Sequence, residues 1–248
     1  MRAAAAVCTL WTGLALVACQ QASTPAAGNG AEGSGPAPGT ESSAAAAGSP
    51  IPDSRDPIPG RPRVVFIGTS LTAGLGLDPD SAYPALVERK ASAAGTPITA
   101  VNAGVSGETS SGALRRLDWV LREPADLIVI ETGANDGLRG QSPEALAQNL
   151  TEIVRRARAA QPRARVALVQ MEAPRNLGAA YVRRFHDVYP AVAKATGVPL
   201  LPFLLDGVAG DPRLNQPDGV HPTEEGERRV ADNVWRGLAP LVASLGAS

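Results

Sequence analysis

Short apolar runs alternate with longer segments of helical pattern along most of this chain, and this alternation restricts the fold more than any other feature. Strands and helices that alternate with short connections favour a parallel sheet covered by helices on both faces. We therefore expect a three-layer α/β sandwich of about five parallel strands. The strands are predicted at Arg63–Gly68, Ile98–Asn102, Asp126–Thr132, Arg165–Met171 and Leu200–Leu204.

Helix start and stop signals agree with this alternation. Residues 142–144, Ser-Pro-Glu, place a capping residue, a first-turn proline and an acid in order. Gly95 and Gly197 each close a helix before a strand. The last helix is expected at about residues 223–245. In parallel sheets of this kind, ligands bind outside the carboxyl ends of the strands.

The composition allows one sizeable hydrophobic core. The chain has 248 residues, of which 44% are hydrophobic and 19% are charged, and we expect one folded domain over residues 63–248. The net charge is −1, and Lys and Arg are scattered rather than grouped. Such a chain has no field that would gather nucleic acid. We therefore expect no nucleic-acid partner, and no required protein partner is evident.

Cysteine and histidine are too scarce for most metal sites. Both cysteines, Cys8 and Cys19, lie near the start of the chain, and the two histidines are His186 and His221. The rest of the chain can form neither a disulfide nor a thiolate metal site, and a polyhistidine centre is nearly excluded. We expect no metal and no cofactor. A mechanism that needs a base at neutral pH must use one of the two histidines.

Residues 1–19 have the pattern of an export signal, in which Arg2 precedes an apolar run shorter than a typical membrane span. The run ends in Leu16-Val17-Ala18-Cys19, which resembles the lipobox of bacterial lipoproteins. We therefore expect Cys19 to become the lipidated first residue, and several acyl chains on one cysteine anchor a protein stably. The protein would then be exported and membrane-anchored, facing the periplasm or the cell exterior. The alternative is a plain secretory signal in which Cys19 is incidental.

Residues 20–62 consist mainly of Ala, Gly, Ser and Pro and contain no aromatic residue. This composition cannot bury enough surface to offset the entropy lost on ordering. We interpret the segment as a flexible tether between the anchor and the domain. A coil of roughly 40 residues has an end-to-end distance of about 35 Å.

Ser70 follows the first predicted strand at a strand-to-helix turn, in the segment Gly68–Gly74. The hydroxyl is exposed at such a turn, and a helix N-terminus favours a developing negative charge. The alternative is that Ser70 only caps the helix. Thr72 stands two residues after the serine, so the Gly-x-Ser-x-Gly elbow is absent.

Asp218 precedes His221 by three residues in the segment Asp-Gly-Val-His-Pro. In one tight turn the carboxylate can accept a hydrogen bond from Nδ1, which leaves Nε2 free to take a proton from a serine. The alternative is a local turn with a solvated histidine. His186 is the rival base, but it lies in the charge-rich helical segment 181–194 and is expected at the helix surface or half-buried.

Two loops of small polar residues follow the second and third predicted strands, at residues 102–109 and 131–136. Both face Ser70 if the sheet is parallel. Acyl transfer needs donors aimed at the oxygen that becomes negative, and a glycine N–H with an asparagine amide would supply them. Taken alone, each loop would be explained by turn glycines and an Asx turn.

Together, these segments resemble the sequence blocks of the GDSL or SGNH hydrolases, and among them the bacterial thioesterase, lysophospholipase and arylesterase group. The likeness extends over about residues 63–242 and implies the SGNH hydrolase form of the flavodoxin-like α/β/α fold. The blocks, in chain order, are Gly68–Leu71, Ser106–Thr109, Gly133–Asp136 and Asp218–His221.

The resemblance implies a role for each candidate residue. Ser70 is the nucleophile, His221 is its base, and Asp218 orients the base. The oxyanion hole consists of the Ser70 N–H, the Gly107 N–H and the Asn135 side chain. The implied reaction is ester hydrolysis through an acyl-serine intermediate, with no metal or cofactor.

One residue departs from the family pattern, because the first block usually has an acid before the serine and here Thr69 takes its place. The expected substrates are aryl esters, esters of small or medium acyl groups, lysophospholipids or thioesters, and export from the cell favours esters over acyl-CoA. The loop 172–178 could flank an acyl or alcohol pocket. Two alternatives remain: a carbohydrate O-deacetylase of the same fold, and a tethered binding module without catalytic activity.

Overall fold

The five predicted strands form one parallel sheet in the computed structural model, which describes residues 60–245. The sheet order is β2-β1-β3-β4-β5, and each neighbouring pair is parallel. The export signal, Cys19 and nearly all of the predicted tether over residues 20–62 lie outside the described residues. The strands are β1 (Arg63–Gly68), β2 (Thr99–Gly104), β3 (Leu127–Ile130), β4 (Arg165–Gln170) and β5 (Leu200–Phe203).

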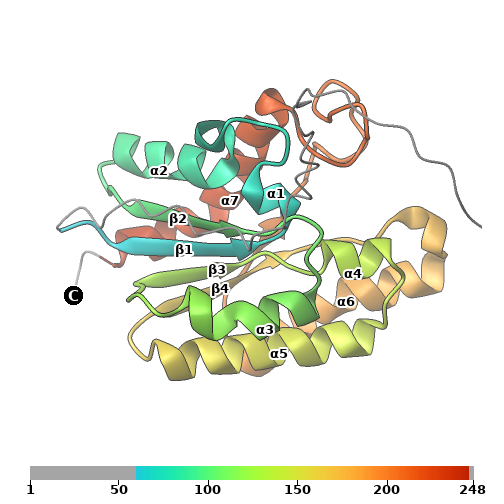
Figure 1. Ribbon diagram of the computed structural model, residues 1–248, viewed down its shortest axis with the longest axis horizontal. Helices are drawn as coiled ribbons and strands as arrows, with labels where there is room; N and C mark the ends of the chain where they lie inside the picture. Colours follow the sequence, from blue (N-terminus) through green and yellow to red (C-terminus); the bar gives the residue numbers. More distant parts are fainter. Residues whose placement is uncertain (1–59, 246–248) are drawn as a thin grey trace, which may run out of the picture. The chain divides into compact units, whose positions relative to one another are not determined.

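Helices cover both faces of the sheet, as Figure 1 shows. This is the three-layer α/β/α sandwich predicted from the sequence. Within residues 60–245, none of the helices has both the length and the apolar character needed to span a bilayer. One layer contains α1 (Ser70–Ala73), α2 (Tyr83–Ala93) and α7 (Glu224–Ala243), and the other contains α3 (Ser110–Val120), α4 (Ala134–Leu138), α5 (Pro143–Ala160) and α6 (Ala179–Thr196).

Strand ends agree with the prediction to within a few residues. β3 is shorter than the predicted 126–132, yet Asp126 and Glu131 stay hydrogen-bonded to β1, with N–O distances of 2.9 and 2.8 Å to the carbonyls of Arg63 and Ile67. The sheet therefore holds Glu131 beside the end of β1, directly next to the turn that carries Ser70.

The predicted helix signals act as expected. The Ser142 hydroxyl accepts from the N–H groups of the first turn of α5. Gly197 ends α6 in the left-handed conformation, with φ 66°. Gly95 follows the end of α2, again with positive φ. Thr223 caps α7, whose helical residues end at Ala243, slightly before the predicted end.

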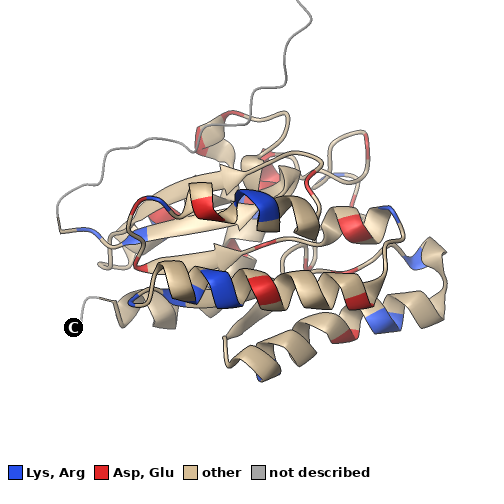
Figure 2. Ribbon diagram, turned by 60° about the horizontal axis from the view of Figure 1, so that its bottom comes forward, with Lys and Arg blue, Asp and Glu red and all other residues tan. Residues whose placement is uncertain are grey.

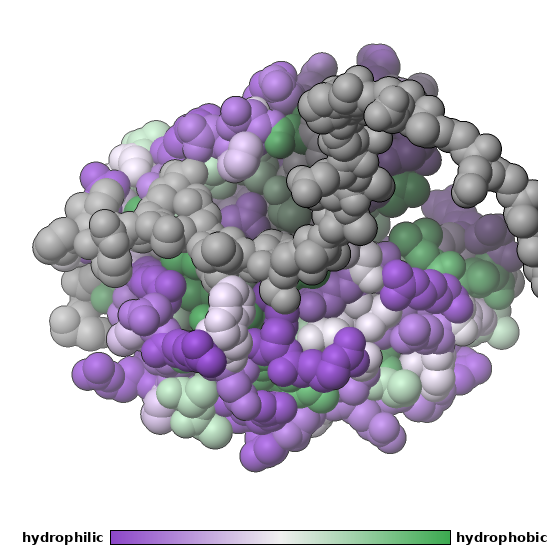
Figure 3. All heavy atoms as spheres, viewed as in Figure 1, coloured by the Kyte–Doolittle hydropathy of each residue, from purple (hydrophilic) through white to green (hydrophobic). Residues whose placement is uncertain are grey.

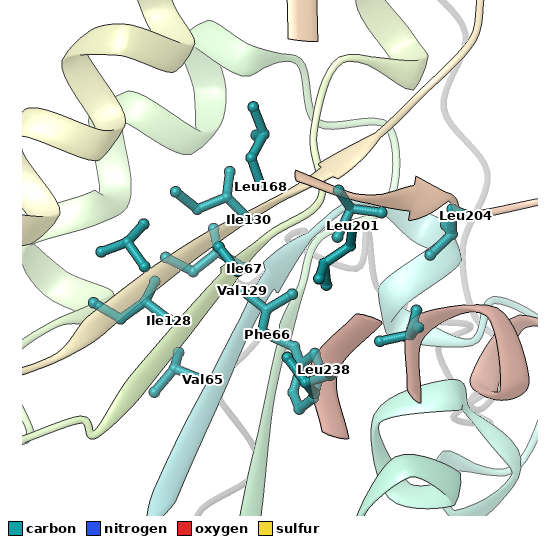
Figure 4. Packing of buried hydrophobic residues seen from close by; sticks show 14 of the residues in the cluster. Val65, Phe66, Ile67, Ile128, Val129, Ile130, Leu168, Leu201, Leu204 and Leu238 are labelled. Atoms are coloured by element: carbon teal, nitrogen blue, oxygen red, sulfur yellow. The ribbon is translucent and has the colours of Figure 1, made fainter. Parts of the chain in front are cut away.

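The core fills both spaces between the sheet and the helices, and Figure 4 shows part of it. Side chains alternate between the two faces of a strand. Phe66 of β1 therefore points to the α2 layer, where its ring meets Tyr83 edge-on with centroids 5.7 Å apart. Its neighbours Val65 and Ile67 are fully buried too. Because both faces are covered, β1 and β3 consist mainly of consecutive apolar residues. Each large apolar side chain that is fully buried contributes about 1.5–3 kcal/mol to the free energy of unfolding.

The carboxyl ends of the five parallel strands share one edge of the sheet, and the loops that follow them gather there (Figure 1). Away from this edge, acidic and basic residues are interspersed along the helices that face the viewer in Figure 2. The site is therefore sought at the edge where the strands end.

Candidate active site

Ser70 is the first residue of α1, directly after the turn that leaves β1. Thr69 caps this helix, and its hydroxyl accepts from the N–H of Leu71. The turn is packed tightly against β2, because a Cβ on Gly104 would lie 2.3 Å from the backbone nitrogen of Ala73. The turn that carries Ser70 is therefore held by close backbone packing against β2, and Ser70 follows the carboxyl end of β1.

The three predicted triad residues form one chain of hydrogen bonds. The Oγ of Ser70 lies 2.9 Å from Nε2 of His221, and Nδ1 of His221 lies 2.6 Å from Oδ2 of Asp218. A carboxylate at Nδ1 fixes the tautomer in which Nε2 can accept a proton from the serine hydroxyl. The structure thus brings together the residues predicted as nucleophile, base and orienting acid, which the sequence separates by as much as 151 positions.

A short hairpin-like loop positions Asp218 and His221. Asn215 and Pro222 form an antiparallel bridge, and the N–H of Gln216 donates to the His221 carbonyl over 2.7 Å. Within this loop, Oδ1 of Asp218 accepts from the N–H groups of Val220 and His221. The hydrogen bond from the His221 side chain, together with these N–H groups, lowers the pKa of Asp218 to about 2. The carboxylate is therefore charged at any pH at which the protein would work.

Three N–H donors lie on the loops around Ser70. Neither the Ser70 N–H nor the Gly107 N–H has a protein acceptor within residues 60–245. The side-chain amide of Asn135 donates one hydrogen to the carbonyl of Glu108 over 3.0 Å, which leaves its second hydrogen available. Strand order brings the three donors close together. Gly107 follows β2 and Asn135 follows β3, and both strands flank β1, which precedes Ser70.

The two donor loops are tied to each other by buried polar contacts. Asp136 accepts from both the N–H and the hydroxyl of Ser110. Arg116 of α3 binds Glu108 through two nitrogens and donates to the Ala103 carbonyl at the end of β2. Charge-assisted bonds of this kind hold a loop more firmly than neutral ones. The Gly107 backbone is thus fixed from both sides.

Position 133, two residues before Asn135, requires a glycine because of its backbone conformation and its close neighbours. Its φ is 111°, and a Cβ there would lie 2.2 Å from the Tyr189 hydroxyl. That hydroxyl donates to the carbonyl of Thr132 over 2.8 Å. The start of α4, and with it the direction of the Asn135 side chain, depends on this close approach.

His186 does not take part in this arrangement. It is exposed on α6, as predicted, and its Nδ1 lies 2.7 Å from Oε1 of Glu172. The same carboxylate oxygen accepts from the Gln170 amide. Within residues 60–245, no group of three or more His, Cys, Asp or Glu side chains is arranged to hold a metal ion.

The buried acid behind Ser70 was not predicted from the sequence. Glu131 is fully buried and accepts from the backbone N–H and hydroxyl of Thr69 and from the hydroxyl of Thr72. Thr72 in turn lies 2.8 Å from the Tyr83 hydroxyl. Burial raises the pKa of Glu131 to about 7, although the three donors oppose this shift. The sequence signal that could have predicted it is the position of Glu131 directly after the apolar run Leu127–Ile130.

Two hollows open on either side of the triad. The first, the apolar hollow, has a volume of about 930 Å³, and its wall includes Leu71 and Val220, the chain neighbours of Ser70 and His221, and Ala134, which precedes Asn135. Hydrophobic residues are visible in a recess at the right of Figure 3, at the end of the domain where the strands end in Figure 1. Its other apolar lining residues are Leu138, Met171, Ala173, Pro174, Val182, Phe203, Leu205 and Ala209.

The second hollow, the arginine hollow, has a volume of about 1090 Å³ and is lined by the loop that carries Gly107, the segment after α1 and the exposed side of α3. Arg115, Arg116 and Arg139 contribute to its wall. Within residues 60–245, the large hydrophobic residues that remain exposed are Leu75, Leu138 and Val220, and each lines one of the two hollows. Exposed apolar surface gathered in this way marks a binding region.

Known proteins resemble this chain in both sequence and structure. A sequence model of the GDSL-like Lipase/Acylhydrolase family matches residues 66–229. Esterase TesA of Pseudomonas aeruginosa is 42% identical over 181 residues, which cover 72% of this chain and 89% of the relative. Thioesterase 1/protease 1/lysophospholipase L1 of Escherichia coli is 37% identical over 180 residues, covering 72% and 84%. The crystal structure of the psychrotrophic esterase EstA from Pseudoalteromonas sp., inhibited by monoethylphosphonate, matches with a TM-score of 0.69 and 32% identity, over 73% of this chain and 98% of that one.

Proposed function

This chain belongs to the GDSL-like Lipase/Acylhydrolase family, and we propose that it is a serine esterase that hydrolyses carboxylic esters through an acyl group bound to Ser70. The observation that carries this proposal is the continuous chain of hydrogen bonds from Ser70 through His221 to Asp218. Such a chain is what the activation of a serine hydroxyl requires.

In the first half of the reaction, Ser70 Oγ attacks the ester carbonyl carbon while its proton passes to Nε2 of His221. The carbonyl oxygen becomes an oxyanion in the tetrahedral intermediate. When the intermediate collapses, the ester C–O bond breaks and His221 gives the proton to the departing alcohol. Asp218 stays ionised and stabilises the imidazolium, which agrees with its lowered pKa of about 2.

In the second half, a water molecule takes the place of the alcohol. His221 accepts a proton from this water, whose oxygen attacks the acyl carbon, and the proton then returns to Ser70 Oγ as the carboxylic acid leaves. The oxyanion forms twice and is bound each time by the same donors. We assign these to the N–H groups of Ser70 and Gly107 and to the side-chain amide of Asn135, whose free hydrogens support the assignment.

The acyl chain occupies the apolar hollow in this proposal. The hollow reaches the triad next to Leu71 and Val220, and its remaining wall is mainly hydrophobic. A volume of about 930 Å³ is large for an acetyl group, so the pocket suits medium acyl chains. Relatives named as an esterase and as a thioesterase and lysophospholipase support the same range of substrates: aryl and acyl esters, lysophospholipids or thioesters.

We propose in addition that the protein is exported and anchored to a membrane through lipidated Cys19. The support is the sequence of residues 1–19, with its apolar run and its ending in Leu-Val-Ala-Cys. Glutamine at position 20, where an aspartate is associated with inner-membrane retention in enteric-type bacteria, weakly favours the outer membrane. An anchored enzyme of this kind would act on esters outside the cytoplasm.

The decisive experiment compares the native chain with Ser70→Ala on chromogenic aryl esters of graded acyl length. We expect activity to be lost in Ser70→Ala and kept in Ser92→Ala, which changes an exposed serine of α2. An alkyl phosphonate with an aryl leaving group should add the mass of its phosphonyl group to the native chain and not to Ser70→Ala, since Oγ bonds to phosphorus and the aryl alcohol leaves.

Two outcomes would redirect the assignment. Activity on acetylated glycans with none on aryl or acyl esters would identify a carbohydrate O-deacetylase. A folded native chain with no hydrolytic activity on either class would identify a tethered binding module. Ester hydrolysis that survives in Ser70→Ala would reject Ser70 as the nucleophile.

A further inference from the structure

We propose that the arginine hollow binds the alcohol part of the ester and selects alcohols that carry a carboxylate or a phosphate, through Arg115 and Arg139. This inference rests on the proposed esterase function and specifies its substrate class. It begins from the position of the two hollows relative to Ser70.

Strand order places Ser70 between the two hollows. The arginine hollow is built mainly by the loops after β1 and β2, at one side of the sheet order β2-β1-β3-β4-β5. The apolar hollow is built mainly by segments after β3, β4 and β5, at the other side. An ester has two arms that diverge from its carbonyl carbon. When that carbon lies at Ser70, one arm therefore points toward each hollow.

The walls of the two hollows differ in charge. Three arginines and one glutamate line the arginine hollow. The charged residues of the apolar hollow are one arginine and two acids, Arg175 with Glu172 and Asp206. An apolar acyl chain suits the wall of the apolar hollow, and an anionic group suits only the wall of the arginine hollow. The alcohol is therefore the arm that carries the negative charge.

Two of the three arginines keep their charge available to a ligand. Arg116 is neutralised by its bidentate contact with Glu108 and is largely buried. Arg115 donates to the neutral Ser111 hydroxyl, and Arg139 donates to the carbonyl of Gly107 over 2.9 Å. Within residues 60–245, neither of them forms an ion pair. A guanidinium has five N–H donors, so most remain free in each.

Trp119 adds an aromatic wall to the same site. It follows Arg115 by four positions in α3, so the two side chains share one face of the helix. Both line the arginine hollow. A flat or extended alcohol can pack against the indole while its carboxylate or phosphate reaches the guanidinium groups. The contact between Arg139 and the Gly107 carbonyl places this anion site next to the proposed oxyanion hole.

The test uses pairs of esters that differ only in the charge of one arm. The first pair is the butyrate esters of meta-hydroxybenzoate and meta-hydroxybenzamide, and the second is monobutyrylglycerol with and without a phosphate. A third pair, phenyl hemisuccinate and phenyl succinamate, carries the charge on the acyl arm instead. For each pair, the ratio of kcat/KM for the charged to the neutral ester is measured on the full chain. Intrinsic reactivity cancels when ratios are compared between variants.

In Arg115→Gln, we expect the ratio to fall about three- to tenfold for the first or second pair, mainly through KM, as befits an exposed charged contact. The pair that responds identifies carboxylate or phosphate as the preferred anion. Arg115→Lys should restore part of the ratio, and added salt should reduce it in the native chain. Arg122→Gln is the matched control, because it removes the same charge at an exposed position just after α3 that does not line the hollow.

Three results would overturn the proposal: an unchanged ratio in Arg115→Gln for both alcohol pairs, an equal loss on the charged and neutral esters, or a charge effect confined to the acyl pair. A native chain that hydrolyses none of the six esters would instead reject the esterase function itself, so the two failures are distinguishable.

Discussion

The backbone N–H of Thr69 donates to Oε2 of Glu131 over 2.8 Å, and the Thr69 hydroxyl lies 3.1 Å from the same oxygen. The residue before the nucleophile is thus attached to the end of the neighbouring strand by a fully buried carboxylate. Thr69 occupies the position where the family usually has an acid, and here it serves as the cap of α1 and as a donor to Glu131. The nucleophile turn therefore depends on Glu131.

The buried Glu131 should make stability fall with rising pH. Burial raises its pKa from 4.5 to about 7, so the folded chain holds this proton more tightly than the unfolded chain. The contribution is fully present below about pH 4.5 and is lost as the pH rises to about 7, on the order of 3 kcal/mol in total. Glu227, whose pKa burial raises to about 8, acts in the same direction.

We therefore expect Glu131→Gln to reduce the pH dependence of stability. Urea unfolding at pH 5 and pH 8 would measure it, with Glu225→Gln on the exposed start of α7 as the control. If native and Glu131→Gln chains lose equal stability over this range, the carboxyl group is not the source of the effect.

Asp218→Asn should slow turnover strongly while leaving the fold intact. The amide can no longer hold His221 in the productive tautomer, and the expected loss in kcat is about 10⁴-fold. Because the pKa of Asp218 is lowered to about 2, its protonation should not contribute to the pH dependence of activity near neutral pH. Steady-state rates on an aryl ester, with Asp187→Asn on the surface of α6 as control, would check both points. A loss below tenfold would contradict the assigned role.

Asn135→Ala should lower kcat by about 10²- to 10³-fold through the loss of one oxyanion donor. The variant also loses the bond to the Glu108 carbonyl, so circular dichroism must verify that it is folded. Asn176→Ala, at an exposed position in the 3₁₀ helix η2 (Arg175–Leu177), is the matched control. An unchanged rate in folded Asn135→Ala would remove this residue from the oxyanion hole.

Ala209→Phe should shorten the acyl chains that the enzyme accepts. Ala209 is exposed and lines the apolar hollow, and a phenyl ring there would occupy space needed by longer chains. We expect kcat/KM to fall about tenfold for octanoyl esters and to change little for acetyl esters. Ala195→Phe, near the end of α6, serves as the control. Equal effects on both esters would show that the acyl chain lies elsewhere.

Cys19→Ser should release the protein from the membrane. The lipobox-like ending of residues 1–19 predicts acylation of this sulfur, and serine cannot replace it. Fractionation of cells that produce the native and variant chains would locate them, and metabolic labelling with a fatty acid would detect the modification. Cys8→Ser is the matched control. A native chain found in the soluble fraction and without label would favour a plain secretory signal in which Cys19 is incidental.

Sequence patterns were sufficient for features that depend on neighbouring residues. The five apolar runs predicted the strands, and local spacing predicted the pairing of Asp218 with His221. Contacts that depend on the lateral order of strands were not predicted, apart from those that the family resemblance implied. Thr69 and Glu131 are 62 positions apart and meet only because β1 and β3 are adjacent. The arginine hollow likewise requires residues that follow three different strands, an arrangement that a linear pattern does not encode.

Two of the three triad residues belong to one small loop, and the amide of Gln216 in that loop donates to the Leu75 carbonyl, just after α1. Completion of the triad thus needs one long-range contact, the docking of this loop beside Ser70. Recovery of ester hydrolysis during refolding would therefore require this docking in addition to the formation of the sheet and helices, which the circular dichroism signal would follow. Ester hydrolysis is therefore a measure of a folding step that the circular dichroism signal alone does not report.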